Sequence, residues 1–243
     1  MGEQLKTIGF AAAVCLVCSL LLAAVYSGLR EEQEQNKANE LKVKVLTAFG
    51  KEIIDGKGKL AVSQEQVDEM FKAEIVGKVL DGNGELVESI TVEALAPEQI
   101  NNRNKETGLK EYYPFYIHTD PATSKKRYAI HLSGMGLWSV VKAYLALEDD
   151  YNTIAGMAFY DHAETPGLGG EIEKDFFQDR FKEKKMLEGD VVKGFQILKP
   201  GMQTDDYCID GISGATMTCK GIANFINSDF AVYNKYFSKL RQK

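Results

Sequence analysis

One short segment, residues 210–221 with the sequence DGISGATMTCKG, combines hydroxyl-bearing residues with small ones. The residues with hydroxyls are Ser213, Thr216 and Thr218, and the small residues between them are Gly214 and Ala215. Apolar residues recur at steps of three and four from Thr218 to Phe237, which predicts an amphipathic helix directly after the segment. A helix N-terminus presents unpaired N–H groups and the positive end of the helix dipole. The segment therefore predicts a site where a phosphate approaches the backbone and the hydroxyls.

The same residues also fit a capped helix with nothing bound. Ser and Thr are common N-cap residues, and Thr218 would then be the N-cap of the C-terminal helix. The segment is not a P-loop, because the spacing G-x-x-x-x-G-K-[ST] is absent. On the residues alone, the phosphate site and the capped helix both stay open.

Two further segments are rich in glycine and leave their backbone exposed. HAETPGLGG, residues 162–170, contains the turn signal Pro166-Gly167 and is either a surface hairpin loop or a loop laid against a flat ligand. SGMGLWS, residues 133–139, contains Trp138, the one tryptophan of the sequence. This tryptophan is either a core anchor or part of a ligand-binding surface.

Other kinds of catalytic site find no support in the sequence. The histidines, which show no metal-binding spacing, are His118, His131 and His162. A G-x-S-x-G motif is absent, and the sequence names no base that would activate Thr216 as the nucleophile of a hydrolase. We therefore predict neither catalytic residues nor a metal site. A disulfide between Cys208 and Cys219 stays open, because sequence position does not give a Cα separation.

The chain of 243 residues is long enough to build one core that positions these segments. Helices are predicted at residues 63–72, with Ser63 as N-cap, at 176–186 and at 218–237. A hairpin is predicted at residues 73–95 around the turn DGNG, and further strands at 111–119, 125–134, 139–149, 151–162 and 190–198. The predicted fold class is α+β, a largely antiparallel sheet packed by helices and preceded by one N-terminal transmembrane helix.

The uncharged segment Thr7–Leu29, TIGFAAAVCLVCSLLLAAVYSGL, spans 23 residues. About 20 apolar residues cross a bilayer as a helix, whereas the apolar core of a cleaved signal peptide has roughly 7 to 15. The length favours a retained anchor over a signal peptide. Lys6 and Arg30 flank the span and do not fix its orientation. A short tail ahead of a single span usually stays inside, which favours a body outside the cytoplasm.

The expected organisation is a transmembrane anchor at residues 1–30, a connecting helix and linker at 31–60, and a binding domain outside the cytoplasm at 61–243. The net charge of −6, without a basic patch, argues against a nucleic-acid partner. The single span carries no charge that would mark an ion path. Nothing in the chain is typical of a nicotinamide, quinone or sodium site.

Three segments together resemble a known family, SGATMT at 213–218, HAETPGLGG at 162–170 and GMGLWS at 134–139. They resemble the FMN-binding subunits with covalently attached flavin, and the match is closest to the C subunits of sodium-translocating NADH:quinone oxidoreductases. The N-terminal span and EEQEQNKANELKVKVLTAFG at 31–50 are also similar to that family. The family signature D-x-x-[ST]-G-A-T falls on residues 210–216, and every position matches.

In this family the last threonine of the signature carries FMN through a phosphoester bond, so the resemblance implies that Thr216 is the attachment residue. It also implies that the loops around Glu164 and Trp138 lie beside the flavin ring. The implied FMN-binding residues are Thr216, Asp210, Ser213, Gly214, Ala215, Thr218, Glu164, Thr165, Gly167, Leu168, Gly169, Leu137 and Trp138. Cys219 departs from the family pattern, where a serine is expected after SGATxT.

The resemblance further implies partners and a location. The implied partners are the other subunits of a six-subunit membrane complex that oxidises NADH, reduces a quinone such as ubiquinone and expels sodium. A separate flavin transferase outside the cytoplasm would attach the FMN. This implies a single-pass protein of the bacterial inner membrane with its globular domain on the periplasmic side. Two alternatives stay open: the G subunit of an Rnf-type ferredoxin:NAD electron transport complex, and a non-redox anchored module that binds a phosphorylated ligand.

Overall fold

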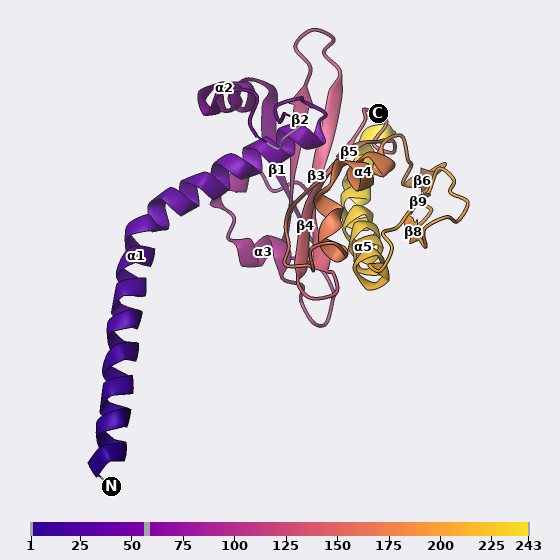
Figure 1. The fold of residues 1–243 in the computed structure, drawn as a ribbon. Helices are drawn as coiled ribbons and strands as arrows, with labels where there is room; N and C mark the ends of the chain where they lie inside the picture. The colour runs from indigo at the N-terminus through magenta and orange to yellow at the C-terminus, as the bar shows by residue number, and fades with distance from the viewer. Residues whose placement is uncertain (1, 56–58, 243) are drawn as a thin grey trace. The chain divides into compact units, whose positions relative to one another are not determined.

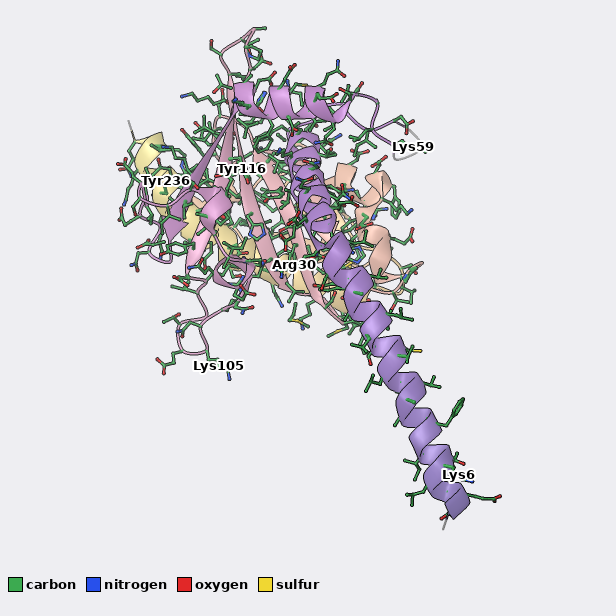
Figure 2. All side chains as sticks on the ribbon, turned by 90° about the vertical axis from the view of Figure 1, so that its left-hand side faces the viewer. Lys6, Arg30, Lys59, Lys105, Tyr116 and Tyr236 are labelled. Carbon is green, nitrogen blue, oxygen red and sulfur yellow. The ribbon has the colours of Figure 1, made fainter. Side chains whose placement is uncertain are left out.

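The computed structural model describes residues 2–55 and 59–242, and the chain divides into two compact units, Met1–Leu41 and Lys42–Lys243. The first unit consists of most of helix α1 (Gly2–Ala48), drawn in indigo and violet in Figure 1. An 18-residue window of α1 has a mean hydropathy of 2.7, and none of it is buried. Lys6 and Arg30, labelled in Figure 2, flank this apolar stretch. The predicted N-terminal apolar helix is confirmed, and its length and composition allow it to cross a membrane.

The second unit is built on a five-stranded antiparallel sheet in which every strand pairs with its neighbour in sequence. The strands are β1 (Ile75–Asp81), β2 (Tyr112–Thr119), β3 (Lys126–Met135), β4 (Val140–Leu147) and β5 (Ile154–Asp161). Their aromatic and β-branched residues suit a pleated surface that is buried on both faces. The α+β class with an antiparallel sheet is therefore confirmed.

Helix α5 (Thr216–Arg241) packs across one face of this sheet, where Figure 1 shows it in yellow. Its buried apolar residues include Ile222, Phe225, Ile226, Phe230, Tyr233 and Phe237, the stripe that the sequence spacing predicted. They form one core with strand residues such as Phe115, Leu132 and Phe159. Gly134 of β3 lets the helix come close, because a Cβ there would lie 2.5 Å from the Cβ of Phe225.

The last turns of α1 belong to the second unit and pack on β5. Val45, Leu46 and Ala48 are fully buried. Gly156 of β5 lies directly against the Ala48 carbonyl, where any side chain would collide. The strand therefore needs glycine at this position, because only a bare backbone lets the helix end approach so closely.

Helix α2 (Gln64–Glu74) begins where the sequence predicted it. The Ser63 hydroxyl accepts from the Gln66 N–H, and the Gln66 side chain accepts from the Ser63 N–H, so the two residues form a capping box. The shorter elements are η1 (Val92–Ala94), α3 (Pro97–Asn101), η2 (Gly169–Glu173), α4 (Asp175–Gln178), η3 (Asp179–Phe181), β6 (Leu187–Glu188), β7 (Val191–Val192), β8 (Gln196–Leu198) and β9 (Cys208–Asp210). Strands β6 and β7 pair antiparallel, and β8 and β9 pair in parallel.

The hairpin predicted at residues 73–95 is wrong in its second half. The first strand and the turn form, but beyond one bridge at Leu86 the described residues 87–95 contain no strand. Gly77 of β1 gives the reason. It has no side chain, and Val92 packs over it, with Cγ2 2.9 Å from where a Cβ would be. The chain therefore crosses β1 instead of running alongside it.

Two further predicted elements are replaced by shorter ones. The helix expected at residues 176–186 is reduced to α4 and η3, because the chain turns at Glu183, where φ is 66°. The Glu183 N–H then donates to the Ile154 carbonyl at 2.8 Å, at the start of β5. The strand expected at residues 190–198 is split into β7 and β8 by Gly194, whose φ is 85°.

Candidate functional site

The three segments that the sequence singled out meet at the carboxylate of Glu164, in the loop after β5. Its hydrogen-bond donors are Thr218 Oγ1 (2.6 Å), Trp138 N (2.9 Å), Leu137 N (3.1 Å), Ser139 N (3.1 Å) and Ser139 Oγ (3.3 Å). Thr218 lies in the first turn of α5, and residues 137–139 lie in the turn between β3 and β4. The structure therefore joins ETPGLG, GLWS and SGATMT through one side chain.

The Glu164 carboxylate is ionised in this setting. The residue is only 5% exposed, and burial raises its pKa. The hydrogen bonds from Thr218 and from the backbone N–H groups of residues 137–139 outweigh burial, so that the pKa of Glu164 lies below its ordinary value. Because the folded pKa is depressed, Glu164 stabilises the fold at neutral pH, and this contribution is lost as the pH falls through that pKa.

Glycines at this junction make room for protein groups. A Cβ at Gly169 would lie 2.6 Å from Thr218 Oγ1, and a Cβ at Gly136 would lie 2.8 Å from Glu164 Oε1. Gly221 of α5 lies directly against the Met135 carbonyl at the end of β3. The glycines in these motifs therefore permit the contacts of Glu164 and the approach of α5 to the sheet.

Helix α5 begins at Thr216 and not after Thr218, so the alternative of a helix capped by Thr218 is wrong. The N-cap is Ala215, and no side chain caps the helix. Within the described segment 211–219, the N–H groups of Thr216, Met217 and Thr218 have no hydrogen-bond acceptor. The Thr218 hydroxyl does not cap because it donates to Glu164. The N-terminus of α5 therefore keeps three backbone donors free.

The surface around this helix start is exposed and largely apolar. Ser213, Gly214 and Thr216 are exposed, and Gly214 turns the chain into α5 with a φ of 77°. The exposed apolar side chains near the junction are Met135, Leu137, Trp138, Leu168 and Met217. Trp138 is 69% exposed, which excludes the core-anchor interpretation. Sequence reasoning missed Met135 and Met217, since isolated methionines carry no motif signal.

The other predicted residues shape the two loops. The Thr165 carbonyl accepts from the N–H groups of Leu168 and Gly170 at 3.1 and 2.9 Å, and Gly167 takes a φ of 77° in the same turn. Ala215 is buried beneath the helix start. Asp210, the first residue of the signature, has one buried carboxylate oxygen, Oδ1, with no hydrogen-bond partner among the described residues.

Arg180 of η3 also belongs to this region, although the sequence gave no signal for it. Its Nη1 donates to the carbonyls of Asp210 and Gly211, both at 2.9 Å. It lines a cavity of about 220 Å³ together with Lys184, Thr204, Ile209 and Asp210. The backbone ahead of Thr216 is therefore held by a cation.

Cys208 and Cys219 are both free thiols in the structure. Cys208 Sγ accepts from the Asp205 N–H at 3.2 Å, and burial raises the pKa of the Cys219 thiol. We expect that alkylation of the unfolded, unreduced protein labels both thiols. Peptide mass spectrometry checks this, and a linked pair of peptides carrying the two cysteines would contradict it.

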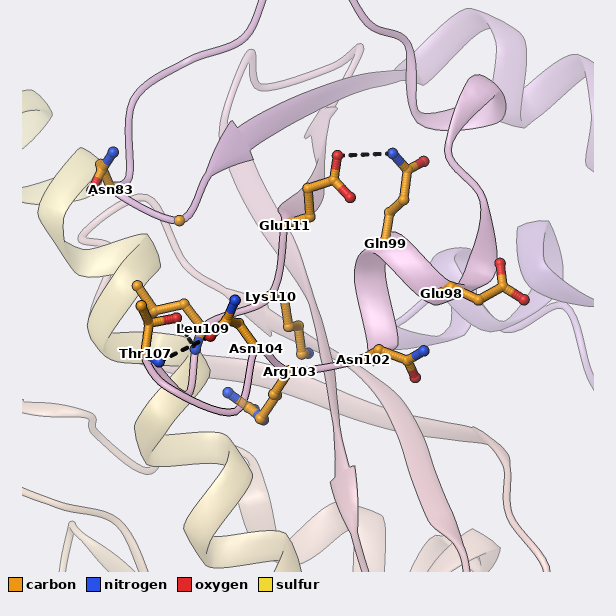
Figure 3. Close-up of a pocket in the computed structure, with 11 residues that line it drawn as sticks. Asn83, Glu98, Gln99, Asn102, Arg103, Asn104, Thr107, Leu109, Lys110 and Glu111 are labelled. Atoms are coloured by element: carbon orange, nitrogen blue, oxygen red, sulfur yellow. Dashed lines mark hydrogen bonds between the residues drawn. The ribbon is translucent and has the colours of Figure 1, made fainter.

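A second hollow, of about 610 Å³, lies beside the loop before β2, and none of the predicted site residues lines it (Figure 3). Most of the residues that line it are polar, among them Glu98, Gln99, Asn102, Arg103, Asn104, Lys110 and Glu111. Both basic residues of its lining pair with Asp229 of α5: Lys110 Nζ at 2.7 Å and Arg103 Nη2 at 2.6 Å. This ion cluster fastens the loop to the helix, and we assign it a structural role.

The fold and the site define an α+β flavin-binding protein, since residues 136–229, which include Glu164 and Thr216, match the FMN-binding domain family. The chain belongs to the family of C subunits of Na(+)-translocating NADH-quinone reductases. It is 30% identical to the C subunit of Vibrio vulnificus, over 89% of this chain and 87% of that protein. It is also 30% identical to that of Vibrio alginolyticus, over 98% of this chain and 94% of that protein.

Solved structures agree with this family. The chain superposes on the corresponding C subunit from Parabacteroides distasonis with a TM-score of 0.69 and 29% identity, covering 86% of this chain and 97% of that one. It superposes on NqrC of Shewanella oneidensis with a TM-score of 0.70 and 22% identity, covering 86% of this chain and all of that one. The second comparison shows a shared fold.

Proposed function

We propose that Thr216 carries FMN in phosphoester linkage and that the chain relays electrons through this FMN within a sodium-translocating NADH:quinone oxidoreductase. The observation that carries the proposal is the uncapped N-terminus of α5, which starts at an exposed threonine hydroxyl. A 26-residue helix that leaves its first N–H groups free presents a strong site for an anion.

The residues present fit an FMN phosphate. The first turn of α5, Thr216 to Cys219, contains no acidic residue of its own, and the nearby Glu164 carboxylate is engaged by the Thr218 hydroxyl at 2.6 Å. The free N–H groups of Thr216, Met217 and Thr218 can donate to phosphate oxygens, and Ser213 offers a further hydroxyl. Gly214, just before this turn, has no side chain of its own, and Leu168 packs against it, with Cδ2 2.7 Å from where a Cβ would be.

The attachment step needs an activated phosphoryl donor, which we take to be a flavin dinucleotide. The Thr216 hydroxyl would form the Oγ–P bond, the phosphoanhydride P–O bond would break, and a nucleoside monophosphate would leave. The hydroxyl proton would pass to a base. Thr216 Oγ1 has no hydrogen bond to any described carboxylate or imidazole, so a separate flavin transferase is proposed to supply that base.

A bound flavin accepts one or two electrons and can therefore link carriers of different type. The exposed side chains of Leu137, Trp138 and Leu168 offer the apolar surface against which a flavin ring would lie. Glu164, Thr165, Gly167 and Gly169 hold the loops that present these side chains, and Ala215 and Asp210 shape the approach to Thr216. Water would be excluded on the protein side of the ring and not on the other.

Intact-mass analysis tests the attachment. The chain coexpressed with a flavin transferase should gain the mass of one FMN less one water, and the chain expressed alone should not. An unchanged mass in the presence of an active transferase would contradict the proposed attachment. A reversible phospholigand module would also show no adduct, so the same measurement separates the two functions.

The proposed setting is a bacterial inner membrane in which the other members of a six-subunit membrane complex oxidise NADH, reduce quinone and expel sodium. Residues 1–30 would be the single-pass anchor, residues 31–60 the connection, and residues 61–243 the FMN-binding domain on the periplasmic side. This is supported by the one helix long and apolar enough to span a membrane among the described residues and by membership of the NqrC family.

The proposed orientation of the chain in the membrane predicts which side a protease can reach. Protease added to cells with a permeabilised outer membrane should digest the body from Arg30 to Lys243, because it faces the periplasm. Immunoblotting against the C-terminal helix follows the loss, with a cytoplasmic protein as the control that stays intact. A body that remains protected until the inner membrane is broken would show the opposite orientation.

A further inference from the structure

The side chain of Arg180 holds the backbone immediately ahead of the attachment segment. Its Nη1 donates to two successive carbonyls, those of Asp210 and Gly211, at 2.9 Å each. The centroid of the Phe176 ring lies 5.3 Å from the guanidinium carbon, so the ring supports the guanidinium as well. One guanidinium therefore fixes two peptide groups at the end of β9.

These carbonyls lie where the strand pairing of β9 ends. The Gly211 N–H donates to the Leu198 carbonyl of β8 at 2.8 Å, and a Cβ at Gly211 would lie 2.6 Å from that oxygen. After Gly211, the bond from the Ala215 N–H to the Ile212 carbonyl closes a single turn before α5 begins. The loop of residues 212–215 is thus anchored by Arg180 at one end and by α5 at the other.

The charge of Arg180 also reaches the start of α5. Burial raises the pKa of the Cys219 thiol, and the Arg180 guanidinium acts in the opposite direction, so its field extends to the first turn of the helix. Its Nε and Nη2 form no hydrogen bond to any residue that the structure describes, and the side chain borders the 220 Å³ cavity. A positive charge near this turn favours an anionic phosphate at Thr216.

We propose that Arg180 is a positioning residue for flavin attachment, which holds the backbone of residues 210–211 so that Thr216 is presented to the incoming flavin phosphate. This inference rests on the proposed attachment at Thr216. Arg180 contacts neither the hydroxyl nor the reacting atoms, so its effect passes through the loop. The flavin transferase would then recognise a preformed loop and would not have to order a mobile one.

The test is the rate of flavin attachment to the full chain by a flavin transferase with a flavin dinucleotide as donor. Arg180→Met keeps the stem over Phe176 and removes the donors and the charge. We expect kcat/KM for the acceptor chain to fall about tenfold or more, because a small misplacement of the nucleophile is costly. Arg180→Lys keeps a positive charge near these carbonyls on a side chain one atom shorter, and it should restore part of the rate.

Arg127→Met is the matched control. Arg127 Nη1 also donates to a backbone carbonyl, that of Phe49 at 3.0 Å, and the side chain pairs with Glu148. It lies at the start of β3, roughly 26 Å along the strand from Met135 at an extended rise per residue. The control variant should lose similar bonds and attach flavin at the wild-type rate per folded molecule.

The outcomes separate this inference from the proposed function. If the wild-type chain gains no flavin, the proposed attachment at Thr216 is overturned, and the positioning role of Arg180 is overturned with it. If the wild type is flavinylated and Arg180→Met keeps the wild-type kcat/KM per folded molecule, only the positioning role is overturned. A loss equal in Arg180→Met and Arg127→Met, in proportion to the loss of folded protein by circular dichroism, also overturns it.

Discussion

Thr216→Val is expected to lose all covalent flavin while keeping its fold. The hydroxyl is the atom through which a phosphate can be tethered at this position, and valine keeps the β-branched shape. The side chain is exposed and forms no hydrogen bond to the described residues, so the free energy of unfolding should change by less than about 0.5 kcal/mol. In-gel fluorescence after denaturation, together with intact mass, measures the tethered flavin.

Two neighbouring hydroxyls serve as controls for this variant. Ser213→Ala should keep the adduct, since Ser213 offers a hydrogen bond and not the ester oxygen. Thr218→Val should also keep it, but it removes the 2.6 Å bond to the buried Glu164 carboxylate and should cost about 1–3 kcal/mol of stability. Flavin that remains on denatured Thr216→Val protein would refute the attachment residue.

Asp229→Ala is expected to destabilise the fold by about 3–5 kcal/mol, because it leaves a buried cation without its partner. The side chains of Lys110 and Asp229 are both completely buried, and Asp229 Oδ2 also accepts from the Ser133 N–H at 3.1 Å. Chemical denaturation of the detergent-solubilised full chain, followed by circular dichroism, gives the free energy of unfolding.

Lys110→Met is the matched comparison, since it removes the cation and leaves Asp229 paired with Arg103. Burial lowers the pKa of Lys110 to about 8. We expect Lys110→Met to cost less than about 1.5 kcal/mol, because methionine has a similar volume and needs no solvation. If Asp229→Ala costs no more than Lys110→Met, the cluster does not hold the loop as described.

Lys110 also makes the free energy of unfolding depend on pH. The unfolded chain binds the Lys110 proton up to its ordinary pKa of 10.5, and the folded chain releases it at a pKa of about 8. The unfolded state therefore holds more protons between these values, so stability from this group rises with pH across that window. Lys110→Met should lack this rise.

The parts of the fold that follow from local pattern were predictable. The apolar stripe of α5, the aromatic and β-branched runs of β2 to β5 and the N-cap at Ser63 each depend on residues close in sequence. The errors arose where a contact between residues far apart in sequence determines the local structure. Val92 packs over Gly77 and diverts the second strand of the hairpin, and Glu183 pairs with the start of β5 and ends the predicted helix.

The candidate site could likewise be predicted from the sequence only in part. The resemblance placed the three motifs together, but it did not give the role of Glu164, whose donors lie 25 to 27 residues before it and 54 after it in the sequence. That convergence is created by the turn between β3 and β4. Arg180 lies in a run of charged residues, where no pattern separates it from Lys182 or Lys184.

The open surface around Thr216 determines how a cofactor can be retained there. A flavin lying on exposed side chains is in contact with protein on one side only, and such a ligand would exchange with free flavin at each dissociation event. A covalent link makes rebinding intramolecular, with an effective concentration of the order of millimolar for a short tether. With the proposed link at Thr216, the chain would leave one side of its flavin accessible to a redox partner without losing the flavin by dilution, a freedom that an enclosed pocket does not give.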